Sequence, residues 1–145
     1  MPTKLAIIFS DIKIQHTVFA LPFAVMSAFL AAEGFPETEK LVWIIVCMVG
    51  ARSAAMAFNR IVDARFDKEN PRTQDRALPS GKINAGNYAV FLIASSALFV
   101  FAAWMLNSLA FYLSPVALAI VFFYSLTKRF TAFSHFWLGD RKSTR

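Results

Sequence analysis

Asn59, Asp63 and Asp67 follow one another at four-residue intervals at the end of a long apolar stretch. If that stretch is a helix that continues through them, their oxygen-bearing side chains project from one face of its end. Proteins hold Mg²⁺ through one or two carboxylates together with phosphate oxygens and water. The spacing therefore predicts a magnesium and phosphate site in which Asp63 and Asp67 bind the metal.

Arginines accompany these carboxylates, and they suit the phosphate half of such a site. The four are Arg60, Arg65, Arg72 and Arg76. Guanidinium groups bind phosphate oxygens through paired hydrogen bonds, and Mg²⁺ can bridge a diphosphate to aspartates that would otherwise repel it. A simpler interpretation stays open. It is a solvated helix end whose aspartates pair with arginines such as Arg60, while Arg72 and Arg76 contact lipid headgroups.

Arg52 lies seven residues before Asn59 and shares its helix face. An arginine within a membrane normally faces a partner or a polar cavity, so it predicts either a structural salt bridge, for example to Asp63, or a functional site. Tyr124 and Lys128 are four residues apart and face the same way near the end of the last apolar stretch. Their alternative role is that of an interfacial aromatic residue beside a snorkelling lysine.

Four apolar blocks must position these side chains. The chain has 145 residues, 57% of them hydrophobic, and a transmembrane helix needs about 20 mostly apolar residues. We expect one all-α membrane domain spanning residues 1–145, a multi-pass bundle of four transmembrane helices. The expected helices cover about residues 12–32, 40–67, 86–106 and 108–128. The first block is short, so Ile12 and Ile14 are expected to extend it.

The turn signals between these blocks are local. Asn70 precedes Pro71, and the residue before a proline avoids the α region, so the second helix is expected to end there. Asn84 or Asn87 is expected to cap the third helix.

The net charge of +6 is concentrated in alternate connections. Basic residues precede the first block, fill the segment between the second and third, and follow the fourth. This pattern predicts that both termini and the aspartate-containing loop are cytoplasmic. Nucleic acid binding is not expected, because the basic loop lacks interleaved aromatic residues beyond Phe66. The single cysteine, Cys47, excludes an internal disulfide, and His16 and His135 are too isolated to argue a metal site.

The longest motif resembles a known family. The pattern N-x-x-x-D-x-x-x-D, followed by N-P-R-T-x-x-R-x-L-P-S-G, is similar to the first aspartate-rich signature of the UbiA-type intramembrane aromatic prenyltransferases. The 4-hydroxybenzoate polyprenyltransferase branch matches best. The segments IKIQHTVFALPFA and YSLTKRFT are also similar to that branch, and the resemblance covers about residues 5–138.

The resemblance implies Mg²⁺-dependent transfer of a polyprenyl group from its diphosphate to an aromatic acid such as 4-hydroxybenzoate, in ubiquinone or menaquinone biosynthesis. Diphosphate leaves, and the electron-rich ring attacks the resulting allylic cation-like carbon. The roles that it implies by motif position are metal binding for Asp63 and Asp67, assistance from Asn59, diphosphate binding for Arg72, Arg76 and Lys128, and lining of the acceptor side by Arg52 and Tyr124. The implied location is a bacterial inner membrane.

One departure from the family pattern is expected to matter. Family members carry a second aspartate-rich motif on a later helix, whereas Asp140 is the only acidic residue after Lys128 here. We therefore expect an amino-terminal half that works with a separate second half or as a homo-oligomer. The alternative is a non-catalytic small membrane protein or subunit. Half of a transporter is less favoured, because paired Gly/Pro-interrupted segments are lacking.

Overall fold

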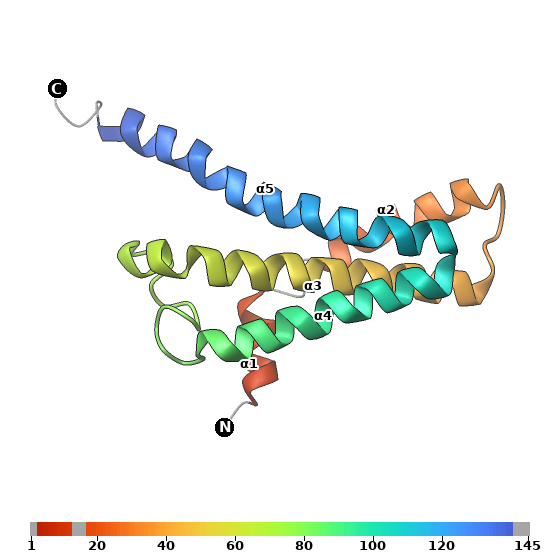
Figure 1. The fold of residues 1–145 in the computed structure, drawn as a ribbon, viewed down its shortest axis with the longest axis horizontal. Helices are drawn as coiled ribbons and strands as arrows, with labels where there is room; N and C mark the ends of the chain where they lie inside the picture. Colours follow the sequence, from red (N-terminus) through yellow and green to blue (C-terminus); the bar gives the residue numbers. More distant parts are fainter. Residues whose placement is uncertain (1–2, 13–16, 141–145) are drawn as a thin grey trace.

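The computed structural model describes residues 3–12 and 17–140, with side chains described as far as Thr127. The described residues form helices and contain no strand, which confirms the all-α class. The helices are α1 (Lys4–Asp11), α2 (Thr17–Ala31), α3 (Thr38–Glu69), α4 (Ala85–Leu106) and α5 (Ser108–Asp140). Helices α3, α4 and α5 run lengthwise through the molecule (Figure 1). The loop formed by residues 70–84 lies at the end opposite the α2–α3 and α4–α5 connections.

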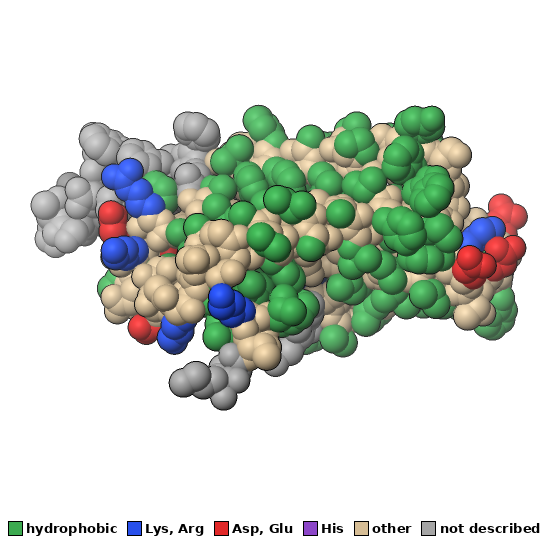
Figure 2. Space-filling model, turned by 60° about the horizontal axis from the view of Figure 1, so that its bottom comes forward, with side chains coloured by type: hydrophobic (Ala, Val, Ile, Leu, Met, Phe, Trp, Pro, Cys, Tyr) green, Lys and Arg blue, Asp and Glu red, His purple; other side chains and the backbone are tan. Residues whose placement is uncertain are grey.

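Three helices are long and apolar enough to cross a membrane. They are α3, α4 and the Ser108–Thr127 part of α5. Helix α2 is apolar but has only 15 residues, so four transmembrane helices are not confirmed. Figure 2 shows hydrophobic side chains over the middle of the molecule and charged side chains at its two ends. That distribution is typical of a helix bundle whose middle contacts the hydrocarbon core of a membrane.

The start of the chain differs from the expected single helix over residues 12–32. Helix α1 ends at Asp11, Ile12 forms its C-cap, and α2 begins at Thr17. Ile12 is 3% exposed and packs in a core cluster with residues of α3 and α4. The prediction that Ile12 extends the first membrane helix is therefore wrong, while Ile14 lies outside the described residues. At the other end, α5 continues to Asp140 instead of ending near residue 128.

The predicted turn signals around the loop are confirmed. Helix α3 has Asn70 as its extended C-cap, directly before Pro71. Asn84 caps α4, because its Oδ1 accepts a hydrogen bond of 2.9 Å from the Asn87 backbone N–H. Gly81 has φ +76°, a left-handed conformation that glycine adopts without steric cost. The loop thus has defined ends and a defined turn.

Small side chains let α3 and α4 approach closely. The buried stripe of α3 includes Gly50, Ser53, Ala54 and Ala57. Helix α4 contributes Ser95, Ala102 and Ala103 as buried residues. A Cβ at position 50 would stand 3.1 Å from the backbone nitrogen of Phe99. Close backbone packing of this kind replaces hydrophobic exclusion as the stabilising force between helices in lipid.

We expect Gly50→Val to destabilise the protein relative to Gly86→Val. Both positions are helical, but Gly86 meets only one atom, at 3.4 Å, so the two variants share the backbone cost and differ in packing. The predicted difference is about 1–3 kcal/mol, the usual cost of overpacking. Thermal unfolding in mild detergent, followed by circular dichroism, measures it. Equal melting temperatures would contradict the close α3–α4 contact.

Candidate functional site

The aspartates and arginines predicted to do chemistry gather where α3 ends and the loop 70–84 begins. Asp67 is 8% exposed in the last turns of α3. Its Oδ2 accepts a hydrogen bond of 2.6 Å from Nη1 of Arg76, and the two side chains form an ion pair. The Asp67 carbonyl accepts a further bond of 3.0 Å from the hydroxyl of Thr73. A predicted metal ligand and a predicted diphosphate-binding residue are therefore in direct contact.

The remaining motif residues surround this pair. Asn59 and Asp63 are half-buried on α3, about two turns and one turn before Asp67, respectively. Arg72 is exposed in the loop, and its backbone N–H donates to the Asn70 side chain at 3.0 Å. An ideal helix rotates each i, i+4 step by about 40°, so Asp67 is turned away from Asn59 and toward the packed side of α3. The stripe predicted from spacing exists, but its last member is the most buried.

The oxygen donors of α3 fit Mg²⁺ in chemical type. Asp63 and Asp67 lie one turn apart, and carboxylate oxygens are the hard ligands that this ion prefers. Arg76 already occupies Oδ2 of Asp67, so a metal would use the other oxygen or displace that contact. Among the side chains that the structure describes, in residues 3–12 and 17–127, no group of three or more His, Cys, Asp or Glu is placed to hold a metal.

Asp11 forms a second polar centre beside the loop. Its Oδ2 accepts a hydrogen bond of 2.5 Å from the hydroxyl of Tyr88, and its Oδ1 accepts one of 3.3 Å from the backbone N–H of Ala77. Its carbonyl oxygen accepts a bond of 2.7 Å from Nη2 of Arg60. One residue at the end of α1 thus joins α3, the loop and α4.

Arg60 and Asp11 also form a buried ion pair. Nε of Arg60 lies 3.2 Å from Oδ2 of Asp11, and the two side chains are only 7% and 10% exposed. The Nε–H does not meet the directional requirement of a hydrogen bond and has no other described acceptor, so this contact is mainly Coulombic. The Nη2 bond to the Asp11 carbonyl supplies the directional part. An arginine–aspartate pair in the predicted motif region is therefore present, but its aspartate comes from α1.

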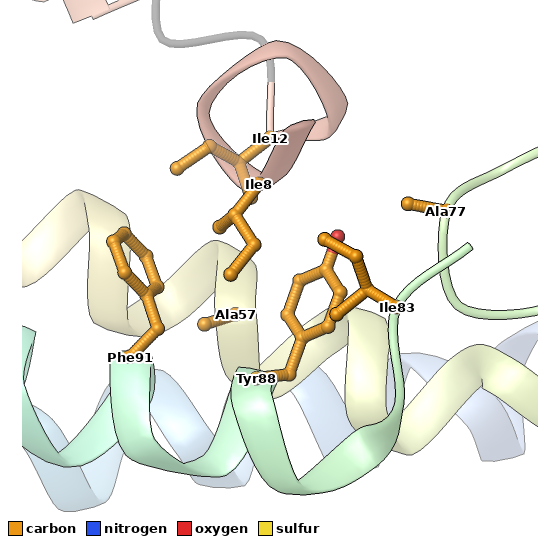
Figure 3. Packing of buried hydrophobic residues seen from close by; sticks show 7 residues of the cluster. All are labelled: Ile8, Ile12, Ala57, Ala77, Ile83, Tyr88 and Phe91. Carbon is orange, nitrogen blue, oxygen red and sulfur yellow. The ribbon is translucent and has the colours of Figure 1, made fainter. Parts of the chain in front are cut away.

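Apolar side chains shield this polar centre. Figure 3 shows Ile8 and Ile12 of α1 above Tyr88 and Phe91 of α4, with Ala57 of α3 between them. Tyr88 is completely buried, and Ile8 is 2% exposed. Exclusion of water strengthens the electrostatic interactions of Asp11 and makes the loss of a partner costly.

The residues predicted to contact the aromatic acceptor lie elsewhere. Arg52 is half-buried on α3 and lines an open pocket of about 490 Å³ with Phe19, Ala20 and Phe23 of α2. Eleven residues separate it from Asp63, about 16 Å along a helix. Tyr124 lies on α5 and is 70% exposed. The structure brings Arg52 to α2 and leaves Tyr124 on the surface of the described residues.

The Lys128 side chain lies outside the described part, although its backbone belongs to α5. Its predicted role in diphosphate binding stays a prediction.

Comparison with known proteins decides the family. The sequence model of the UbiA prenyltransferase family matches residues 20–139. The chain belongs to the UbiA prenyltransferase family. The apo structure of a UbiA homologue from Aeropyrum pernix K1 superposes with a TM-score of 0.74 at 38% identity. The match covers 80% of this chain and 42% of that one.

Individual UbiA-family enzymes show the same relationship. The 4-hydroxybenzoate octaprenyltransferase of Paraburkholderia phytofirmans is 35% identical over 140 residues, covering 96% of this chain and 48% of the relative. The 4-hydroxybenzoate octaprenyltransferase of Shewanella sediminis is 35% identical over 124 residues, covering 85% of this chain and 43% of the relative. The chain therefore spans less than half the length of these curated relatives.

The sequence did not reveal the role of Asp11, Tyr88 and Thr73 in this UbiA-family chain. From the sequence, the expected partners of Arg60 were the aspartates at the end of its own helix. The structure instead pairs Arg60 with Asp11. A usable signal was the position of Arg60 seven residues before Asp67, which places it on the packed face of α3 and requires a counter-charge from another element.

We expect Arg60→Met to be strongly destabilising, because it leaves the buried Asp11 carboxylate without its cation. The predicted loss is about 3–5 kcal/mol of the free energy of unfolding. Lys40→Met is the matched control, since the Lys40–Glu37 pair is exposed at 56% and 73% and is worth about 0–1 kcal/mol. Thermal melting in detergent compares them. Similar melting temperatures for the two variants would contradict a buried pair.

Proposed function

We propose that this UbiA-family chain carries a magnesium-dependent diphosphate site for prenyl transfer. The proposed reaction moves a polyprenyl group from polyprenyl diphosphate to an aromatic acid such as 4-hydroxybenzoate, in ubiquinone or menaquinone biosynthesis. The 2.6 Å contact between Arg76 and Asp67 is the observation that carries the proposal. It joins an anion-binding and a cation-binding side chain at the polar end of an apolar bundle. The names of the relatives support the substrate class.

Each motif residue has a role in this proposal. Asp63 and Asp67 bind Mg²⁺, and Asn59 assists with its amide oxygen. Arg72 is exposed in the loop, and Arg76 is paired with the proposed metal ligand Asp67. Lys128 completes the proposed diphosphate contacts. Mg²⁺ held by Asp63 and Asp67 would supply positive charge that neutralises the diphosphate.

The residues of the chain contribute by stabilising the leaving group. The allylic carbon–oxygen bond breaks and its electron pair leaves with the diphosphate, whose added charge the guanidiniums of Arg72 and Arg76 stabilise. Preorganised cations act strongly in a site of low dielectric constant, because they need no reorganisation as charge develops. The aromatic ring then forms a carbon–carbon bond to the allylic carbon and loses a ring proton.

The pocket beside Arg52 is the proposed entrance for the aromatic acid. Its guanidinium can pair with a carboxylate, and Phe19 and Phe23 supply apolar walls. Tyr124 is proposed to approach the same ligand from α5. The pocket is open, so further walls are proposed to come from a second half of the protein or from a second copy. The membrane orientation is likewise proposed, with both termini and the loop 70–84 on the cytoplasmic side of a bacterial inner membrane.

One observation favours the alternative of a non-catalytic membrane subunit. An open groove of about 710 Å³ between α4 and α5 is lined almost entirely by apolar side chains, among them Trp104, Phe111 and Phe122. A helix of another polypeptide would bury this groove. The two functions are separated by an assay of this chain with and without a second half.

We expect membranes that contain this chain to bind labelled polyprenyl diphosphate with Mg²⁺, and to form prenylated product with 4-hydroxybenzoate when a second half or a second copy completes the site. Asp63→Asn should lower the rate of prenyl transfer by more than about tenfold. The substitution removes one of the two carboxylate charges proposed to bind Mg²⁺ together with the diphosphate. Asp75→Asn is the matched control, since Asp75 is an exposed loop carboxylate outside the proposed site. Product formation is quantified by chromatography.

Two results would contradict the proposal. One is diphosphate binding that is unchanged in an Asp63→Asn/Asp67→Asn double variant. The other is equal loss of activity in Asp63→Asn and Asp75→Asn. A correctly inserted chain that binds diphosphate without forming product, with and without a second half, would favour the subunit alternative.

A further inference from the structure

The carboxylate of Asp11 contacts the loop 70–84 one residue away from Arg76. Oδ1 of Asp11 accepts a hydrogen bond of 3.3 Å from the Ala77 backbone N–H. Arg76 in turn donates to Asp67 at 2.6 Å. These contacts connect the end of α1 to the aspartate motif on α3 through two adjacent loop residues.

From this connection we infer that Asp11 is a positioning residue for the diphosphate site. It holds the loop so that the Arg76 guanidinium stays beside Asp67 before the ligand arrives. The inference rests on the proposed function for its effect on diphosphate, although the loop restraint itself does not. Holding a loop in its binding geometry raises affinity, because the ordering cost is met before binding.

The other described hydrogen bonds of the loop join it to its own neighbours in the chain. Thr73 donates to the Asp67 carbonyl, and the Arg76 carbonyl accepts from the Ser80 N–H at 3.0 Å. The Ile83 N–H donates to the Ala77 carbonyl at 3.1 Å, which folds the second half of the loop back on Ala77. Ala77 is 4% exposed and packs with Ile83 in the core cluster. Asp11 adds a polar contact to this apolar packing, from a position far away in sequence.

The two carboxylate oxygens of Asp11 have different partners, so its role in positioning the loop can be tested apart from its role in stabilising the fold. Oδ2 faces Tyr88 and Arg60, while Oδ1 faces Ala77. Asparagine at position 11 retains an amide oxygen that can accept from the Ala77 N–H but loses the charge that Arg60 requires. Alanine loses both interactions. Placing both substitutions in an Arg60→Met/Tyr88→Phe background removes the buried cation and the hydroxyl that donates to Oδ2, so the remaining polar difference between them lies at Ala77.

The test compares Asp11→Asn with Asp11→Ala in lipid nanodiscs, both in the Arg60→Met/Tyr88→Phe background. Trypsin cleavage after Arg72 and Arg76 reports how often the loop opens. We expect the alanine variant to be cleaved about three- to tenfold faster than the asparagine variant, the effect of losing one hydrogen bond. Equal cleavage rates for two folded variants would overturn the inference.

The unsubstituted chain provides a second test that does not depend on how the variants fold. Hydrogen exchange followed by mass spectrometry should show protection of the Ala77 amide, in contrast to the exposed Asp75 nearby. Exchange of Ala77 as fast as that of Asp75 would overturn the restraint.

Binding of inorganic pyrophosphate with Mg²⁺ tests whether the restraint of the loop by Asp11 affects the proposed diphosphate site. Calorimetry should give a dissociation constant about three- to tenfold weaker for the alanine variant than for the asparagine variant. Faster cleavage together with unchanged pyrophosphate affinity would overturn the positioning role. If the unsubstituted chain does not bind pyrophosphate while the cleavage difference persists, the proposed function fails and the loop restraint stands.

Discussion

The buried guanidinium of Arg60 requires a counter-charge, and Asp11 meets that requirement. An unpaired ion in such a place is strongly destabilising, so the end of α1 is held against α3. Once there, the same carboxylate engages Tyr88 of α4 and the loop at Ala77. The arrangement of α1, the loop and the start of α4 therefore follows from neutralising one cation. The apolar residues packed around this ion pair raise the energetic cost of leaving either charge unpaired.

The helices are held together by different interactions in the middle of the bundle and at its polar end. In the middle of the bundle, α3 and α4 pack through small residues such as Gly50 and Ala54. Larger side chains there, such as Ile93 and Trp104, are exposed. At the polar end, hydrogen bonds and ion pairs replace close backbone packing. The polar end can therefore carry several charges, because α3 and α4 are also held together along their length by close contacts between uncharged small residues.

Features set by residues close together in the sequence were predictable. The end of α3 at Asn70 and the cap at Asn84 need only neighbouring residues, and the spacing of Asp63 and Asp67 needs only helix periodicity. The Asp11 centre was not predictable from spacing, because it joins residues 49, 66 and 77 positions apart. The end of α1 at Asp11 was missed for the same reason. Isoleucine at position 12 suits a membrane helix and a packed cluster equally well.

The length of α3 has a consequence for how a ligand arrives. Its 32 residues extend about 48 Å, whereas a hydrocarbon core is about 30 Å thick. Asp63 and Asp67 occupy the last turns, so they would lie near the lipid headgroups if the apolar part of α3 spans the membrane. The proposed substrate, a diphosphate with a long apolar tail, would then reach them while its tail stays in the leaflet. Encounter would be a two-dimensional search, and its rate would scale with the amount of ligand per area of membrane rather than with its concentration in water.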